Sequence, residues 1–476
     1  MKYCYTILFF LLITLNATMA QDTHYGTQQY GTRSALLGGA VVAGAPDNST
    51  VFYNPGALGF IENPSISVNA NLYRIENITI ENALGQQADF RSSQFGSVPI
   101  LIGGMFKIKS EKWKVGYGVV APVDFQFKGN ARLDDDYAIV DDEESPGAEA
   151  FVGESEKSSR LSEVSLNLGV GRKLNENWSV GLTHMFTLRN QTYNRQLLAH
   201  MILNDPAQTL VNTTIFQYLK YFDVRYAAKL GIAYQNTAWK LGLTLTTPSL
   251  GLFGSGTLAA DITAQNMKLG GDTRVNGFAS DRQEELKTSF RSPFSVAAGA
   301  EYNFQRAMLA FSVQYFGAVD TYDIIRSTPA DFVRYGTFGS SLGSEDLLVV
   351  LGGARPVLNA VLAYEYQWNE QLSFSMSFRN DMSYLDNTLS DQRGYKTTIS
   401  SWDIYHLVGG TTIKRERSSM SIGLLLSTGN NNAHEERGAI GTPAEVNLIQ
   451  GITTITKANY SSIGFLLGYT FNFRKF

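Results

Sequence analysis

The chain has 476 residues, with 44 Gly, 17% charged residues, 12% aromatic residues and a formal net charge of −4. The charged fraction is below the roughly 25% of soluble globular proteins, and the high share of Gly, Tyr and Phe argues against a disordered chain. The net charge and the lack of a basic block argue against nucleic acid as a partner.

A secretory signal peptide is predicted over residues 1–20. Lys2 precedes an apolar run over residues 7–15, and Ala20 stands before a polar pair. The apolar run is shorter than the roughly 20 residues that a membrane-spanning helix needs. Cys4 is the single cysteine, so the mature chain is expected to have no disulfide.

Residues 21–63 do not alternate like a strand. The segment is Gly-rich and mostly apolar, and such a compact piece of about 40 residues can plug the lumen of a barrel. Taken alone, its Asn-Pro-Gly sequence is also typical of a simple turn. Its candidate functional residues are Gly38, Gly39, Asn54, Pro55 and Gly56.

From residue 64 onward, apolar residues alternate with small or polar residues, as in strands with one apolar face. In residues 65–72, for example, Ile66 and Val68 alternate with Ser and Asn. The same pattern recurs at residues 113–119, 164–170, 178–182, 222–234, 239–245, 294–304, 309–315, 358–364, 372–378, 420–426 and 463–473. No later segment has 18 consecutive apolar residues, so membrane-spanning helices are not expected.

The lengths of the links decide between a membrane barrel and a large soluble β protein. Short links lie at residues 109–112, 173–177, 235–238, 304–306, 369–371 and 414–418. Long links alternate with them at about residues 76–98, 129–160, 195–212, 247–286, 318–356, 386–400 and 429–459. Short turns at one end and long loops at the other are typical of bacterial outer-membrane barrels. We therefore predict an all-β fold, a 14-stranded antiparallel transmembrane β-barrel over residues 64–476, in the outer membrane of a Gram-negative bacterium.

Aromatic residues fit this topology. Four tryptophans lie at or beside short links, where an interfacial belt is expected, although ordinary packing at strand ends gives the same pattern. They are Trp113, Trp178, Trp239 and Trp368. The last strand ends in alternating aromatic residues and resembles the signal that such barrels present to the barrel-assembly machinery, although the alternation closes on Phe473 and not on Phe476.

The third predicted strand begins at Trp113 and ends in Gly-Val-Val-Ala-Pro122-Val-Asp-Phe. Proline has no N–H to donate to a strand ladder. Pro122 therefore marks a break or bulge in the wall, or the place where the strand leaves the membrane.

The N-terminal segment with Asn54-Pro55-Gly56, the third strand with Pro122, the stretch around Pro248 and the strand number resemble the FadL family of outer-membrane transporters for hydrophobic compounds. In that family the N-terminal segment is a hatch inside the barrel with an Asn-Pro-Ala motif, in which Gly here replaces Ala. The resemblance implies a hatch over residues 21–63. It also implies a kink in the third strand that opens the wall sideways.

Alternation assigns several charged side chains to the lumen, because charged groups facing lipid cost roughly 2–4 kcal/mol for Arg or Lys. The candidate partners of a ligand carboxylate are Arg189, Arg225, Lys229 and Arg379. The candidate lining of an apolar path is Met185, Met308, Phe316 and Leu466. An ordinary ion-pair network remains the alternative, with the acids Asp223, Glu301, Glu365 and Asp381.

Catalytic and cofactor motifs are absent from the sequence. The five histidines are scattered, and no Gly-x-Ser-x-Gly, His-Glu-x-x-His, Walker or dinucleotide motif occurs. Residues 134–156 carry ten acids and no base, which suits calcium or a solvated external loop, but lack the calcium-loop pattern Asp-x-Asp-x-Asp-Gly. We expect no enzyme activity, no cofactor and no resident metal.

The resemblance implies passive transport of long-chain fatty acids or other hydrophobic small molecules. The expected partners are such a ligand and outer-membrane lipid, and we expect a monomer. Two other functions stay open on the sequence alone: a general diffusion porin, and the barrel component of a protein secretion system.

Overall fold

The computed structural model describes residues 23–44, 47–62, 64–268, 273–336, 340–386 and 395–473. The predicted signal peptide and Phe476 lie outside these residues. The helical elements are short: α2 (Thr50–Tyr53), the 3-10 helix η1 (Pro55–Phe60) and α4 (Ser344–Leu347). No helix in the described residues has the length and hydrophobicity to cross a membrane.

Most of the described strands form the barrel wall, as an antiparallel sheet in chain order. The strands are β1 (Ser65–Glu81), β2 (Phe90–Phe106), β3 (Trp113–Val120), β4 (Asp124–Tyr137), β5 (Glu149–Lys173), β6 (Trp178–Ile202), β7 (Leu210–Gln235), β8 (Trp239–Thr246), β9 (Leu250–Lys268), β10 (Arg274–Lys287), β11 (Ser295–Phe304), β12 (Ala307–Phe316), β13 (Val319–Arg326), β14 (Val333–Tyr335), β15 (Val349–Ala354), β16 (Val357–Gln367), β17 (Leu372–Asp381), β18 (Asp403–Arg415), β19 (Ser418–Ala439) and β20 (Gln450–Asn472).

Three wall strands are interrupted part-way, so that β3 with β4, β8 with β9, and β10 with β11 each form one strand of the wall. The short strands β13, β14 and β15 belong to the connection between β12 and β16. The wall therefore has the 14 strands that alternation predicts.

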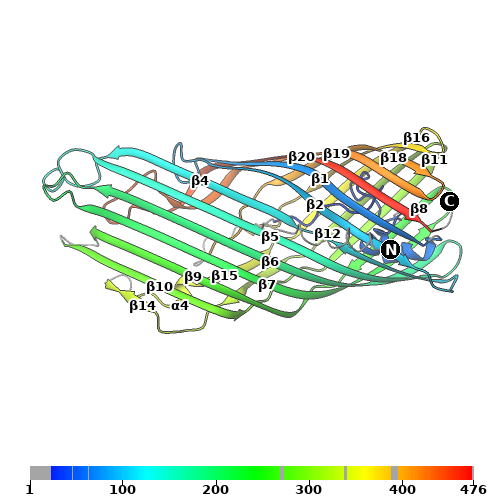
Figure 1. Ribbon diagram of the computed structural model, residues 1–476, viewed down its shortest axis with the longest axis horizontal. Coiled ribbons are helices and arrows are strands. Elements are labelled where there is room, and N and C mark those ends of the chain that lie inside the picture. The colour runs from blue at the N-terminus through cyan, green and yellow to red at the C-terminus, as the bar shows by residue number, and fades with distance from the viewer. Residues whose placement is uncertain are drawn as a thin grey trace, which may run out of the picture.

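The barrel closes because β1 pairs with both β2 and β20. In the closing ladder Ser65 lies opposite Asn472, and Glu81 lies opposite Lys457. A closed ladder satisfies the backbone N–H and C=O groups within the sheet, as a wall in lipid requires. Figure 1 shows the strands running obliquely along the molecule, with the C-terminus at the end where the short links lie. We call this end the turn end and the opposite end the loop end.

The two faces of the wall differ as alternation predicts. On β5, Leu166 and Leu168 are exposed on the outer surface, whereas the intervening Ser165 and Asn167 are buried on the inner face. The four tryptophans that the sequence places beside short links are all exposed near the turn end. The outer surface thus carries an apolar band with an aromatic rim, which suits a lipid environment.

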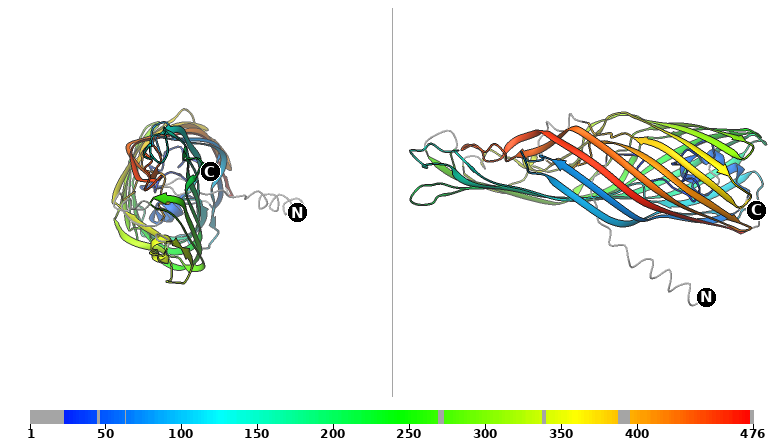
Figure 2. Two further views of the ribbon diagram at one scale, coloured as in Figure 1. Left: turned by 90° about the vertical axis from the view of Figure 1, so that its left-hand side faces the viewer. Right: turned by 90° about the horizontal axis from the view of Figure 1, so that it is seen from above.

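Several strands continue well beyond this apolar band at the loop end (Figure 1, Figure 2). β5 and β6 have 25 residues each and β7 has 26, against the roughly 9–11 that cross a bilayer. The long links expected at residues 129–160 and 195–212 are therefore wrong in extent, because paired strands fill most of both. In these extensions the outer face is largely polar, whereas the inner face carries apolar side chains such as Phe151, Leu197, Met201 and Val211, which are buried in one hydrophobic cluster. The ladder continues there, but its apolar side faces inward.

The described part of the N-terminal segment lies inside the barrel, toward the turn end (Figure 2). Leu36 packs on Gly423 of β19, and Leu58 packs on Gly171 of β5, so closely that neither glycine has room for a side chain. Glycine on the inner face of the wall therefore makes space for the segment.

Candidate functional site

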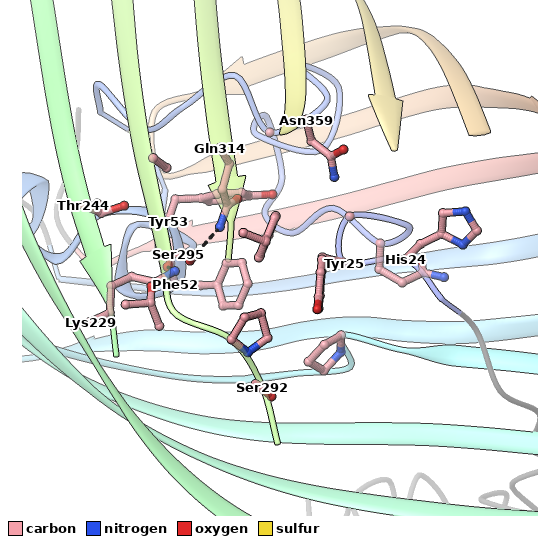
Figure 3. Close-up of a pocket in the computed structure, with 18 of the residues that line it drawn as sticks. His24, Tyr25, Phe52, Tyr53, Lys229, Thr244, Ser292, Ser295, Gln314 and Asn359 are labelled. Atoms are coloured by element: carbon pink, nitrogen blue, oxygen red, sulfur yellow. Dashed lines mark hydrogen bonds between the residues drawn. The ribbon is translucent and has the colours of Figure 1, made fainter. Parts of the chain in front are cut away.

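A cavity of about 230 Å³ lies between the N-terminal segment and the inner face of the wall. Figure 3 shows Tyr25, Phe52 and Tyr53 of the segment facing wall residues such as Lys229 and Gln314 across this space. The predicted site residues that line it are Gly38, Gly39, Pro122, Met185, Arg189, Arg225, Lys229, Phe316 and Arg379.

Two of the residues predicted to line an apolar path lie outside the cavity. Met308 and Leu466 are buried in a hydrophobic cluster with Leu36, Leu37 and Val41 of the N-terminal segment. They therefore pack the segment against the wall and do not line the cavity described above.

The Asn-Pro-Gly motif fastens the N-terminal segment to β7. Asn54 donates from Nδ2 to the carbonyl oxygens of Val42 (2.7 Å) and Ile232 (3.1 Å), and its Oδ1 accepts from the N–H of Gly56 (2.9 Å). A Cβ at Gly56 would lie 2.8 Å from the carbonyl group of Gly231. The close approach to β7 explains why glycine stands at this position, since an alanine methyl group would collide with the wall.

Pro122 lies in a true interruption of the wall. β3 pairs with β5 up to Val120 opposite Ser165, and β4 resumes with Asp124 opposite Ser162. The proline segment therefore has one residue more than the facing stretch of β5, which is a bulge.

The neighbouring ladder changes at the same point. β2 pairs with β3 from Leu101 to Phe106, but the described pairing of β4 is with β5. Between β2 and β4 the described contacts include a bond from the N–H of Lys128 to Oγ of Ser92 (3.0 Å) in place of a regular ladder. The wall therefore lacks a regular ladder here, beside the cavity that Pro122 lines.

Two of the predicted basic residues bind one carboxylate that sequence reasoning missed. Arg189 and Arg225 donate to the two oxygens of Glu163, at 2.7 and 2.8 Å, and all three side chains are buried. The ring of Phe290 covers the cluster, with its centroid 3.7 Å from Cζ of Arg189. Parity alone could have found Glu163, because it precedes the outward-facing Val164 on β5.

Lys229 and Arg379 bind the N-terminal segment. Nζ of Lys229 donates to the carbonyl oxygen of Phe52 at 2.6 Å and lies 4.4 Å from the centroid of its ring. Arg379 donates to the carbonyl oxygens of Gly26 and of Thr27, the latter at 3.1 Å. Both cations thus line the cavity and also hold backbone of the segment.

The four acids of the alternative network have separate partners. Glu365 binds Arg33 of the N-terminal segment at 2.5 Å, and Glu301 binds Lys240 at 2.5 Å. Asp381 accepts from the N–H of Gly26 at 3.1 Å, and Asp223 accepts from the N–H of Phe290 at 3.1 Å. The lumen is therefore an ion-pair network in part, but with pairings other than the ones considered from the sequence.

Aromatic rings form one side of the cavity. Tyr25 stacks between Phe316 and Tyr384, with ring centroids 4.2 and 4.4 Å apart. With Phe52 and Phe290, these rings give the cavity large apolar faces among its charged groups.

The acidic stretch at the loop end makes ion pairs. Glu144 lies between β4 and β5 and binds Lys268 (3.0 Å) and Arg274 (2.7 Å), and Glu445 binds the same two bases. The hydrogen bond from Lys268, followed by that from Arg274, lowers the pKa of Glu144. Within the described residues no group of three or more His, Cys, Asp or Glu side chains has the arrangement of a metal site.

No family model matches the chain. A sequence relative is the putative outer membrane protein NMB0088 of Neisseria meningitidis serogroup B, which is 32% identical over 111 residues. The match covers 22% of this chain and 23% of the length of that protein.

Solved structures match over nearly the whole chain. A Pseudomonas aeruginosa FadL homologue has a TM-score of 0.58 at 12% identity, covering 96% of this chain and 100% of its own. The toluene transporter TodX of Pseudomonas putida has 0.57 at 12% (95% and 100%), and the toluene transporter TbuX of Ralstonia pickettii has 0.54 at 12% (94% and 99%). The fold is FadL-like. The resemblance predicted from the sequence is confirmed at this level.

A FadL-like fold, with its apolar outer band, makes the protein an outer-membrane β-barrel. Its short turns correspond to the periplasmic side and its extended strands to the outside of the cell. In these terms the cavity lies in the membrane part of the barrel, between the N-terminal segment and the interrupted strands.

Proposed function

We propose that the protein is an outer-membrane channel through which hydrophobic small molecules, fatty acids among them, diffuse passively. The observation that carries the proposal is the position of the cavity. It is lined by the N-terminal segment on one side and by Pro122 on the other, where the wall lacks a regular ladder. A molecule in this cavity has a short route sideways into the bilayer.

In this proposal the N-terminal segment is a hatch. It lies across the lumen toward the turn end, so it separates the cavity from the periplasm. The hydrogen bond from Asn54 to Ile232 and the ion pair between Arg33 and Glu365 hold the hatch in place while a ligand leaves through the wall. Aqueous passage through the whole barrel is therefore not the expected route.

The chemistry of the cavity suits an apolar body with a polar end. Burial of an alkyl chain contributes about 0.8 kcal/mol per methylene with little geometric selectivity. Lys229 is the proposed partner of a carboxylate, because its described contacts are a carbonyl group and a ring, whereas Arg189 and Arg225 already share Glu163. The names of TodX and TbuX as toluene transporters support a hydrophobic ligand.

The test is uptake of radiolabelled oleate and of radiolabelled toluene by cells that lack their own transporter for these compounds. Cells that produce the protein should take up at least one of them faster than cells that produce an unrelated barrel of similar abundance. Equal uptake of both compounds in the two strains would reject the proposal. Large steady ion conductance of the pure protein in planar bilayers would instead favour a general porin.

A further inference from the structure

A second interruption of the wall lies between the seventh and eighth wall strands. The ladder between β8 and β11 ends at Thr246 opposite Ser295, and that between β9 and β10 begins at Ser255 opposite Lys287. Between these points, residues 250–254 of β9 pair with β7. On the other side, residues 288–294 belong to no strand.

Residues 288–294 turn away from the wall into the barrel. The N–H of Ser289 donates to the carbonyl oxygen of Ile324 on β13 at 2.9 Å, and that of Phe290 donates to Asp223 at 3.1 Å. Phe290, Ser292 and Pro293 line the cavity. The eighth strand therefore leaves a break in the wall whose inner side is the cavity itself.

The outer side of this break is apolar. Leu250, Leu252 and Phe253 are exposed to 64%, 52% and 62%. Above the first break, in contrast, the outward positions of β4 are polar, namely Asp124 and Gln126, while Phe125 and Phe127 face inward and are buried. The outer surface beside the second break is therefore apolar, as a route into the bilayer requires.

The two breaks lie at the same height. Pro122 is nine residues beyond Trp113, and Pro248 is nine residues beyond Trp239, where both tryptophans are exposed at the turn end. Two hydrogen bonds join residues 247–249 to residues 288–294: the N–H of Ser249 donates to the carbonyl oxygen of Ser292 (3.1 Å), and the N–H of Ser292 donates to Oγ of Ser249 (2.7 Å). At the edge of the break the N–H of Thr288 donates to the carbonyl oxygen of Gly254 at 3.5 Å.

We propose that residues 247–249 and 288–294 form a second lateral portal, through which hydrophobic small molecules pass between the cavity and the bilayer. The bonds between Ser249 and Ser292 are its gate. Because Ser249 and Ser292 form two bonds and no ladder, moving residues 247–249 away from residues 288–294 breaks these two bonds and leaves the strands on either side intact. The inference rests on the proposed function, since it names an additional exit for the same ligands.

A disulfide across the gate tests the portal. The variant Ser249→Cys/Ser292→Cys is made in a chain whose single cysteine lies in the predicted signal peptide. The matched control is Leu243→Cys/Ala298→Cys, a facing pair in the intact ladder between β8 and β11 that does not line the cavity. Oxidation of the first variant should slow oleate uptake at least twofold, reduction should restore it, and the control should respond to neither.

Uptake by the oxidised Ser249→Cys/Ser292→Cys variant at the rate of its reduced form would overturn the portal while leaving the proposed function intact. Failure of the wild-type protein to take up oleate or toluene would instead overturn the proposed function, and the portal with it.

A second measurement does not depend on disulfide formation. A bimane label on the single variant Ser292→Cys should be quenched by lipids brominated on the acyl chain, and a label on Thr244→Cys in the intact wall should be quenched at least twofold less. Equal quenching at the two positions would contradict lipid access at the break.

Discussion

Arg225 donates a hydrogen bond from Nε to Oγ of Ser292 at 2.9 Å. Its Nη2 donates to Glu163 at 2.8 Å, and the backbone N–H of Glu163 donates to the carbonyl oxygen of Val123 at 2.8 Å. Val123 follows Pro122, and Ser292 belongs to the second interruption. Hydrogen bonds therefore connect the charge cluster to both interruptions of the wall.

The first prediction concerns this charge cluster. Glu163→Gln removes the negative charge that Arg189 and Arg225 share, and breaking a buried ion pair from one side costs about 3–5 kcal/mol. Thermal unfolding of the purified barrel should show this loss. The control Glu154→Gln breaks an exposed pair with Arg132, so its loss of stability should be much smaller. Equal losses in the two variants would contradict the role of the cluster.

The second prediction concerns the first interruption. Pro122→Val supplies a backbone N–H and allows the ladder to extend across the bulge, so transport should fall at least twofold while membrane assembly is unchanged. Uptake of labelled oleate and the amount of folded barrel in outer membranes are the two measurements. Pro206→Val, in the exposed link between β6 and β7, is the control. Unaltered transport by Pro122→Val would reject a role for the bulge.

The third prediction concerns the hatch motif. Gly56→Ala places a methyl group 2.8 Å from the carbonyl group of Gly231, and overpacking of this kind costs about 1–3 kcal/mol. We expect a less stable hatch, seen as an increase in ion conductance in planar bilayers. Gly409→Ala on β18, where a Cβ meets nothing within 4 Å, should conduct like the wild type. The same conductance in both variants would argue against a tightly fitted plug.

The fourth prediction concerns Lys229. Lys229→Met removes the proposed partner of a carboxylate, and a hydrogen bond to a charged group contributes about 1.5–3 kcal/mol. The Kd for oleate should rise about tenfold or more, whereas the Kd for oleyl alcohol should change little. Competition with a fluorescent lipid measures both values, with Lys220→Met, at an exposed position of β7, as the control. Parallel changes for acid and alcohol would show that the residue acts only by holding Phe52.

The fifth prediction concerns pH at the loop end. The pKa of Glu144 is lowered from its ordinary value of 4.5, chiefly by the hydrogen bond from Lys268. A lowered pKa stabilises the fold above the ordinary value, and this contribution is lost as the pH falls through the lowered pKa. The difference in Tm between the wild type and Glu144→Gln should therefore be present near neutral pH and shrink as the pH falls below about 4.5. The exposed Glu143→Gln is the control, and a pH-independent difference would contradict the account.

Alternation in the sequence predicts the orientation of side chains well, because a strand has a period of two residues whatever it pairs with. Arg189, Arg225, Lys229 and Arg379 face the lumen as expected, and all four line the cavity. The two-residue period does not determine which charged groups pair with one another. Arg189 on β6 and Arg225 on β7 both bind Glu163 of β5, and Lys229 binds backbone of the N-terminal segment.

The sequence alone determined that the chain forms a 14-stranded membrane barrel with an N-terminal segment of separate character, because hydrophobic period, link length and glycine content are local properties. The tertiary structure decided which distant segments of the chain lie side by side. Whether Pro122 merely ends a strand or breaks the wall depends on β2 and β5, and the importance of Pro248 depends on residues 288–294, some forty positions away. Registers and interruptions arise from pairing between distant segments, which composition and period do not encode.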